Sequence, residues 1–177
     1  IQVNASDVCS GSVGQDAAPL ALRRGGMMVG FEASARHAAS YRPPVVTMRP
    51  GGRSPFVFVC DHASNRVPSI YGNHGLTPHQ RLMHIAWDPG ALAVAVALAE
   101  QLDAPLVHST VSRLIIDCNR NIDASDLIPV ISERTEIKAN AGISQSERDH
   151  RIGNYHAPFH AAIDAVRAAS QVPGANA

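Results

Sequence analysis

The 177-residue chain is long enough for one domain with a substantial core and too short for two. Lys plus Arg and Asp plus Glu each number 15, and this zero formal charge argues against a nucleic-acid binder, which needs a basic surplus. No run of about 18 apolar residues is present, so the sequence predicts no membrane span.

Residues 1 to about 50 are rich in Ala, Ser, Gly and Arg and show no sustained hydrophobic periodicity. Because such a composition buries too little apolar surface to offset its ordering entropy, we predict a flexible, partly non-native leader over 1–50. Met27-Met28 is a candidate start of the native protein. Residues 51–170 are predicted to form a single domain, and residues 171–177 an unstructured tail.

From Pro55 onward, strand and helix patterns alternate, which is typical of an α/β fold. Apolar residues occur on both faces of the first strand, as a central strand of a helix-covered sheet requires. The predicted strands are Phe56–Cys60, Pro105–Ser109 and Arg113–Asp117.

Two Asx/Thr-Pro pairs mark helix starts, since each places an N-cap residue before a proline at the first helical position. Thr77-Pro78 opens a short helix to about His84, and Asp88-Pro89 opens a largely buried helix over Gly90–Leu102. Residues 123–140 are predicted to be a polar loop over the substrate or the surface.

A last helix is predicted to begin at the capping box Ser144-Gln-Ser-Glu147. Pro158 lies inside this helix and should kink or divide it near Asn154–Tyr155, because proline removes a backbone donor.

Three widely spaced cysteines, Cys9, Cys60 and Cys118, form no Cys-x-x-Cys pair, which argues against a cysteine zinc site. Cys60 and Cys118 lie at or near the ends of apolar runs, where a reduced, buried thiol behaves as a small hydrophobic residue. The N-terminal segment lacks the continuous apolar stretch of a secretory signal, and we therefore predict a cytoplasmic protein.

His62 follows the first predicted strand, and Asn65 lies three residues further on. An imidazole at a strand end is a natural zinc ligand, and a second ligand three residues later can reach the same ion. The alternative is that Asp61, Ser64 or Asn65 caps a short helix and that His62 is a hydrogen-bonded turn residue.

Arg120 follows the third predicted strand and offers a planar fork suited to a carboxylate, with an amide donor beside it in Asn119. The alternative is a solvated arginine at the start of a loop. Arg113 lies four residues before Asp117, so on a strand the two would share a face. Pairing between them would make Arg113 structural.

Two histidine pairs have helical spacing. His84 and Asp88 could share a face on which the carboxylate orients the imidazole or both bind a metal, although Asp88 also fits a capping role. His156 and His160 have the same spacing, but Pro158 between them distorts the face and argues against a metal role.

Three segments together resemble the N-formylglutamate amidohydrolase family: Cys60-Asp-His-Ala-Ser-Asn-Arg-Val-Pro68, His84-Ile-Ala-Trp-Asp-Pro-Gly-Ala91 and Ser112-Arg-Leu-Ile-Ile-Asp-Cys-Asn-Arg120. The resemblance covers roughly residues 50–168. It implies a three-layer α/β/α fold with a mixed, mostly parallel sheet, as in the zinc carboxypeptidases and aspartoacylases.

That wider group shares a strand-end His-x-x-Glu zinc motif and a downstream Asn-Arg pair. Carried onto this chain, the resemblance implies His62 as a ligand to zinc or another divalent metal, with Asn65 at the Glu position. It also implies a carboxylate clamp of Asn119 and Arg120, with Arg113 as a further candidate for substrate binding. The anionic ligand or proton shuttle would be Asp61 or Asp88.

The implied activity is hydrolysis of an N-acyl acidic amino acid, most directly of N-formylglutamate to formate and glutamate in histidine degradation. Family members usually continue into a His-Ser-Phe-Thr-Pro-like segment that would supply another zinc ligand, and no such segment occurs here. The expectation is a C-terminally truncated member with an incomplete sheet. The alternative is a non-catalytic α/β module that binds a small carboxylate.

Overall fold

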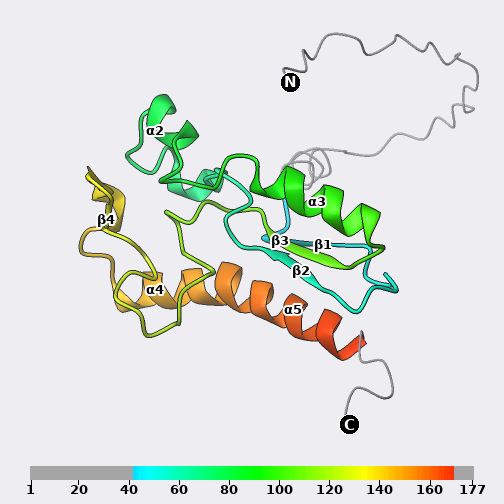
Figure 1. Cartoon of the computed structure of the whole chain (residues 1–177). Helices are drawn as coiled ribbons and strands as arrows, with labels where there is room; N and C mark the ends of the chain where they lie inside the picture. The colour runs from blue at the N-terminus through cyan, green and yellow to red at the C-terminus, as the bar shows by residue number, and fades with distance from the viewer. Residues whose placement is uncertain (1–41, 170–177) are drawn as a thin grey trace, which may run out of the picture. The chain divides into compact units, whose positions relative to one another are not determined.

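The computed structural model describes residues 42–169 (Figure 1). The predicted tail and residues 1–41 of the predicted leader lie outside this range. The leader prediction is wrong for its last part, because strand β1 (Val45–Met48) belongs to the main sheet. All four residues of β1 pair with β3, from Val45 opposite Ser109 to Met48 opposite Leu106, and this pairing orders the segment.

The main sheet is mixed and has the strand order β1-β3-β2. Strand β2 (Phe58–Cys60) runs parallel to β3 (Leu106–Ser109), and β1 runs antiparallel to it. The strand predicted at Arg113–Asp117 is wrong, since this segment forms turns. Its apolar side chains are buried, but they are buried by surrounding segments and not by strand pairing.

Two helices pack on opposite faces of β3, which explains why its neighbouring residues Leu106 and Val107 are both fully buried. Leu106 contacts the cluster of α3 (Ala91–Gln101), and Val107 contacts the cluster of α5 (Ala157–Ala169). Figure 1 shows α3 and α5 on either side of the strands. The structure is therefore a mixed α/β fold, and β3 is its most buried strand.

Helix α2 (Pro78–Leu82) begins as predicted, with a capping box between Thr77 and Gln80. Helix α3 begins differently, because its N-cap is Gly90 in the left-handed conformation and Asp88 uses its side chain elsewhere. The prediction that α3 is largely buried is also wrong: its sheet-facing residues pack, whereas Val94 on the other face is 61% exposed.

The C-terminal helix is divided near the predicted position. Helix α4 (Gln145–Arg151) is followed by a π-helical turn η3 (Ile152–His156) and then by α5. The π turn precedes Pro158, whose missing N–H would leave an α-helical carbonyl unpaired. The Ser144 hydroxyl caps α4 by accepting from the Glu147 N–H at 3.1 Å.

Residues 123–140 carry a small hairpin, so the prediction of a loop without secondary structure is wrong. Strands β4 (Ile131–Ser132) and β5 (Thr135–Glu136) pair antiparallel, and 3-10 turn η2 (Lys138–Asn140) follows them. Strands of two residues are too short to produce an alternating pattern. A further 3-10 turn, η1, spans Ser69–Tyr71. Among residues 42–169, no helix has the length and apolarity needed to cross a bilayer.

Candidate functional site

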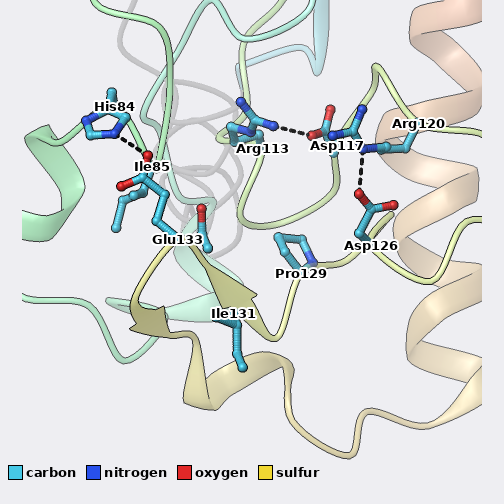
Figure 2. Close-up of a pocket in the computed structure, with 10 residues that line it drawn as sticks. His84, Ile85, Arg113, Asp117, Arg120, Asp126, Pro129, Ile131 and Glu133 are labelled. Atoms are coloured by element: carbon cyan, nitrogen blue, oxygen red, sulfur yellow. Dashed lines mark hydrogen bonds and ion pairs between the residues drawn. The ribbon is translucent and has the colours of Figure 1, made fainter.

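A cavity of about 280 Å³ opens between the turn at 113–120 and the β4–β5 hairpin (Figure 2). Arg113, Asp117 and Arg120 lie on one wall, and Pro129 and the hairpin lie on the other. The charged side chains of this wall come from the two ends of one segment. Its middle residues, Leu114, Ile115 and Ile116, are apolar and buried.

Asp117 is the most buried charged group of this site, and its carboxylate accepts three hydrogen bonds. The donors are Nε2 of His62 at 2.7 Å, Nη2 of Arg113 at 2.8 Å and the backbone N–H of Asn119 at 2.9 Å. Burial alone would raise the pKa of Asp117, but the hydrogen bond and charge of His62, with Arg113 and the Asn119 N–H, lower it. Asp117 is therefore an anion that fixes its neighbours.

The hydrogen bonds of His62 identify which ring nitrogen exchanges protons. Because Asp117 is an anion, Nε2 carries a hydrogen and donates it. Nδ1 lies 3.2 Å from both Nη1 of Arg113, which can only donate, and Oδ2 of Asp88, which accepts. A neutral ring accepts from Arg113, and a protonated ring donates to Asp88. Nδ1 is thus a proton-exchange position with a partner for each state.

The charge balance around His62 favours its protonated form. Burial lowers its pKa and Arg113 opposes the cation, but the hydrogen bond and charge of Asp117, with Asp61, outweigh both and raise the pKa. The Asp61 carboxylate also accepts from the backbone N–H of His62 at 3.0 Å. The ring therefore gains a proton more readily than a free imidazole.

Arg120 lies on the cavity wall, where its Nε donates to Asp126 at 2.7 Å. Both side chains are partly exposed, so this pair is screened by water. Asn119, the predicted partner of Arg120 in a clamp, is exposed and contributes its backbone N–H to Asp117. The prediction that Arg113 pairs with Asp117 is confirmed, although a turn and not a strand brings them together.

In the structure, the histidines of the two pairs with helical spacing hydrogen-bond to groups outside their pairs. His84 hydrogen-bonds through Nε2 to Glu133 at 2.7 Å and does not pair with Asp88; this contact joins the end of α2 to the hairpin across the cavity. His156 hydrogen-bonds to the carbonyl of Arg120 at 2.9 Å, and His160 to that of Cys118 at 3.1 Å. These last two histidines hold the turn that carries Arg120.

The described residues do not fit the predicted metal site of His62 and Asn65. Both ring nitrogens of His62 already contact protein groups, and the Asn65 amide donates to the carbonyl of Arg81 at 3.0 Å. Over 42–169, no three His, Cys, Asp or Glu side chains are grouped to hold a metal. The alternative interpretation of His62 as a hydrogen-bonded residue describes these contacts better.

Sequence reasoning missed the partnership of His62 with Asp117, and missed Asp126 and Glu133 altogether. The available signal was position: His62 and Asp117 each follow an apolar run, and both side chains are buried. Their separation of 55 residues hides the pairing from any local pattern.

Comparisons with known proteins found similarity over the part of the chain that contains the cavity. A family model described as N-formylglutamate amidohydrolase matches residues 54–175. No curated protein matches. Among solved structures, the gene product Atu2144 from Agrobacterium tumefaciens is similar, with 37% identity and a TM-score of 0.72 over 73% of this chain. The match covers 52% of that protein, so the present chain spans about half of its length.

Proposed function

We propose that this chain, which belongs to the N-formylglutamate amidohydrolase family, hydrolyses the amide of an N-acyl acidic amino acid. The proposed substrate is N-formylglutamate, and the products are formate and glutamate. The observation that carries the proposal is the buried His62–Asp117 pair, 2.7 Å apart, at the edge of a cavity that Arg120 also lines. In such a pair the imidazole can take up and release a proton while the carboxylate stays ionised and stabilises the imidazolium.

In the proposed reaction, Asp88 takes a proton from the attacking water. Its side chain is 50% exposed whereas that of His62 is 7% exposed, so Asp88 is the member of the group that meets solvent. The water oxygen bonds to the formyl carbon, the C–N bond breaks, and the leaving nitrogen takes the proton back. His62 shares this proton through Nδ1, and Asp117 balances the resulting imidazolium charge.

Arg120 is proposed to bind a carboxylate of the substrate. Asp126 accepts from Nε and the Asn119 carbonyl accepts from Nη1 at 3.4 Å, so Nη2 and the second hydrogen of Nη1 are proposed to bind the substrate carboxylate. Because Arg120 is partly exposed, Arg120→Ala should raise KM about tenfold with a smaller effect on kcat. Arg167→Ala removes an exposed arginine of α5 and is the matched control, with KM unchanged.

The decisive assay is formate release from N-formylglutamate by the whole chain. We expect Asp88→Asn to lower kcat by about 10²-fold, the ordinary contribution of a general base. Asp123→Asn replaces an exposed carboxylate that, unlike Asp88, is not among the side-chain partners of His62, and it should leave kcat unchanged. Wild-type turnover by Asp88→Asn would refute the role of Asp88.

A second candidate function is a non-catalytic module that binds a small carboxylate through Arg120. The specific observation in its favour is that Arg120 lines the cavity and already binds a carboxylate there, that of Asp126. Calorimetry with N-formylglutamate separates the two candidates. Binding without formate release, in a chain that melts cooperatively, would favour the module over the hydrolase.

Metal dependence stays a prediction of the family resemblance, and elemental analysis of purified protein tests it. One equivalent of zinc or another divalent ion would confirm it. The relation to zinc carboxypeptidases and aspartoacylases, with a three-layer fold, is likewise proposed; the packing of α3 and α5 on opposite faces of β3 supports the layered arrangement. The cytoplasmic location and the role in histidine degradation also stay predictions.

A further inference from the structure

A buried amide connects the two walls of the cavity. Asn140 is 2% exposed, and its Nδ2 donates to the carbonyl oxygens of Leu114 and Pro129, each at 2.8 Å. Its Oδ1 accepts from Nε2 of His74 at 2.9 Å and from Nη1 of Arg151 at 2.8 Å. Two hydrogens and two lone pairs are thus all used, which is the full capacity of the side chain.

The chemistry of these partners fixes the orientation of the amide. Arg151 can only donate, and the two carbonyls can only accept, so a reversed amide would place oxygen against oxygen and NH₂ against a guanidinium. No other side chain of this length supplies two donors and two acceptors. Aspartate lacks the donors, and leucine lacks both. Position 140 therefore requires asparagine.

The two carbonyls belong to opposite walls of the cavity. Leu114 lies in the turn between Arg113 and Asp117, whereas Pro129 lines the other wall and precedes the β4–β5 hairpin. One nitrogen atom, Nδ2 of Asn140, holds both segments at hydrogen-bond distance. Movement of the hairpin away from the turn would break at least one of these bonds inside the protein.

Helix α4 anchors this arrangement. Arg151 is 2% exposed, and besides Asn140 it donates to the carbonyl of Ile115 at 3.0 Å and through Nε to Glu147 at 2.6 Å. The Arg151 guanidinium also lies over the ring of Tyr71, 4.7 Å from its centroid. Arg151 therefore fixes Asn140 and the turn at once, and its charge is balanced within its own helix.

We infer that Asn140 is a positioning residue that sets the separation between the Arg113–Asp117 wall and the hairpin wall. It touches no reacting atom. Its effect on a bound acyl amino acid rests on the proposed function, whereas the coupling of the two walls does not. Loss of the Nδ2 donors should release the hairpin and misplace a ligand held between the walls.

Hydrogen exchange measured by mass spectrometry tests the coupling without any ligand. Asn140→Asp keeps the size and the acceptor for Arg151 but cannot donate to the two carbonyls. Amide exchange in residues 130–137, including the Ile137 N–H that closes the hairpin onto Val130, should rise by about tenfold or more.

The matched control is His74→Asn, which withdraws one donor from Oδ1 together with the His74 hydrogen bond to the Leu114 backbone, and leaves both Nδ2 bonds of Asn140 intact. His74 has φ of 57°, a conformation that asparagine adopts readily. Exchange in residues 130–137 of this variant should stay within about threefold of wild type. Equal exchange in the two variants would overturn the inference.

The ligand measurement adds a separate result. At a temperature well below both melting points, Asn140→Asp should raise KM for N-formylglutamate about tenfold or more, and His74→Asn should leave it unchanged. If wild type neither binds nor hydrolyses N-formylglutamate, the proposed function fails, and the exchange comparison still decides the coupling.

If neither Asn140→Asp nor Asn140→Ala folds, the inference is tested by hydrogen exchange of the wild-type protein. In low denaturant, residues 112–117 and 130–137 should then open in one step with a common denaturant dependence, because one side chain ties them together. Separate opening of the hairpin would overturn the inference.

Discussion

Replacing Asp117 with asparagine is the sharpest test of the site. The change preserves volume but removes the charge that His62, Arg113 and the Asn119 N–H all donate to. An asparagine oxygen can serve one or two of these donors, while its NH₂ must face a third, so a buried donor loses its partner. Breaking a buried ion pair in this way costs about 3–5 kcal/mol.

The assay is urea unfolding at pH 7, with the free energy of unfolding compared between wild type and Asp117→Asn. The matched control is Asp126→Asn, which breaks the partly exposed pair with Arg120 and should cost about 0–1 kcal/mol. A loss for Asp117→Asn below about 1 kcal/mol, or equal to that of the control, would refute the reasoning.

The same pair predicts how stability varies with pH. The raised pKa of His62 contributes stability fully below its ordinary value of 6.5, and this contribution is lost as pH rises through the raised pKa. The lowered pKa of Asp117 contributes stability above its ordinary value of 3.8, and this is lost as pH falls through the lowered pKa. The contribution of the pair is therefore greatest between 3.8 and 6.5. Asp117→Asn should flatten this profile, and nuclear magnetic resonance titration should show the His62 pKa falling in the variant.

Three further predictions concern the scaffold. Gly52→Ala should destabilise the protein by about 1–3 kcal/mol in urea unfolding, because the added Cβ would lie 2.6 Å from the Asp103 carbonyl oxygen. Cys60 and Cys118 should react slowly with iodoacetamide at pH 7 until the protein unfolds, since burial above all raises their pKa values to about 11 and about 12. Thr77→Ala should lower the free energy of unfolding by about 1 kcal/mol through loss of the capping box, and an unchanged melting temperature would contradict this.

Local signals predicted local structure well. Thr77 begins α2 and Ser144 begins α4 because a cap requires only partners three residues away. Strand β2 ends at Cys60 as expected from its apolar run. By contrast, β1 was hidden by the Pro and Gly residues around it, and its four residues form a strand only because β3 pairs with them.

The site depended on contacts that no local pattern contains. Asp88 looks like a helix cap in sequence, yet its side chain contacts His62, 26 residues away. The apolar run at 114–116 resembled a strand because burial in a turn and burial in a strand select the same side chains. The sequence thus identified Arg113, Asp117 and Arg120 and the pairing of the first two, but not the partners of His62 and Arg120.

The π-helical turn between α4 and α5 sets the direction in which the side chains after it point relative to the side chains before it. Arg151 before the turn holds the buried amide, and His156 at its end holds the carbonyl of Arg120. Each residue added to or removed from a helix rotates everything beyond it by about 100°. Deleting one residue at 152–155 would therefore point His156 and His160 away from the carbonyls of Arg120 and Cys118, without changing the identity of any residue that lines the cavity. The number of residues between these two contacts is consequently as much a determinant of the cavity as the identity of any group that lines it.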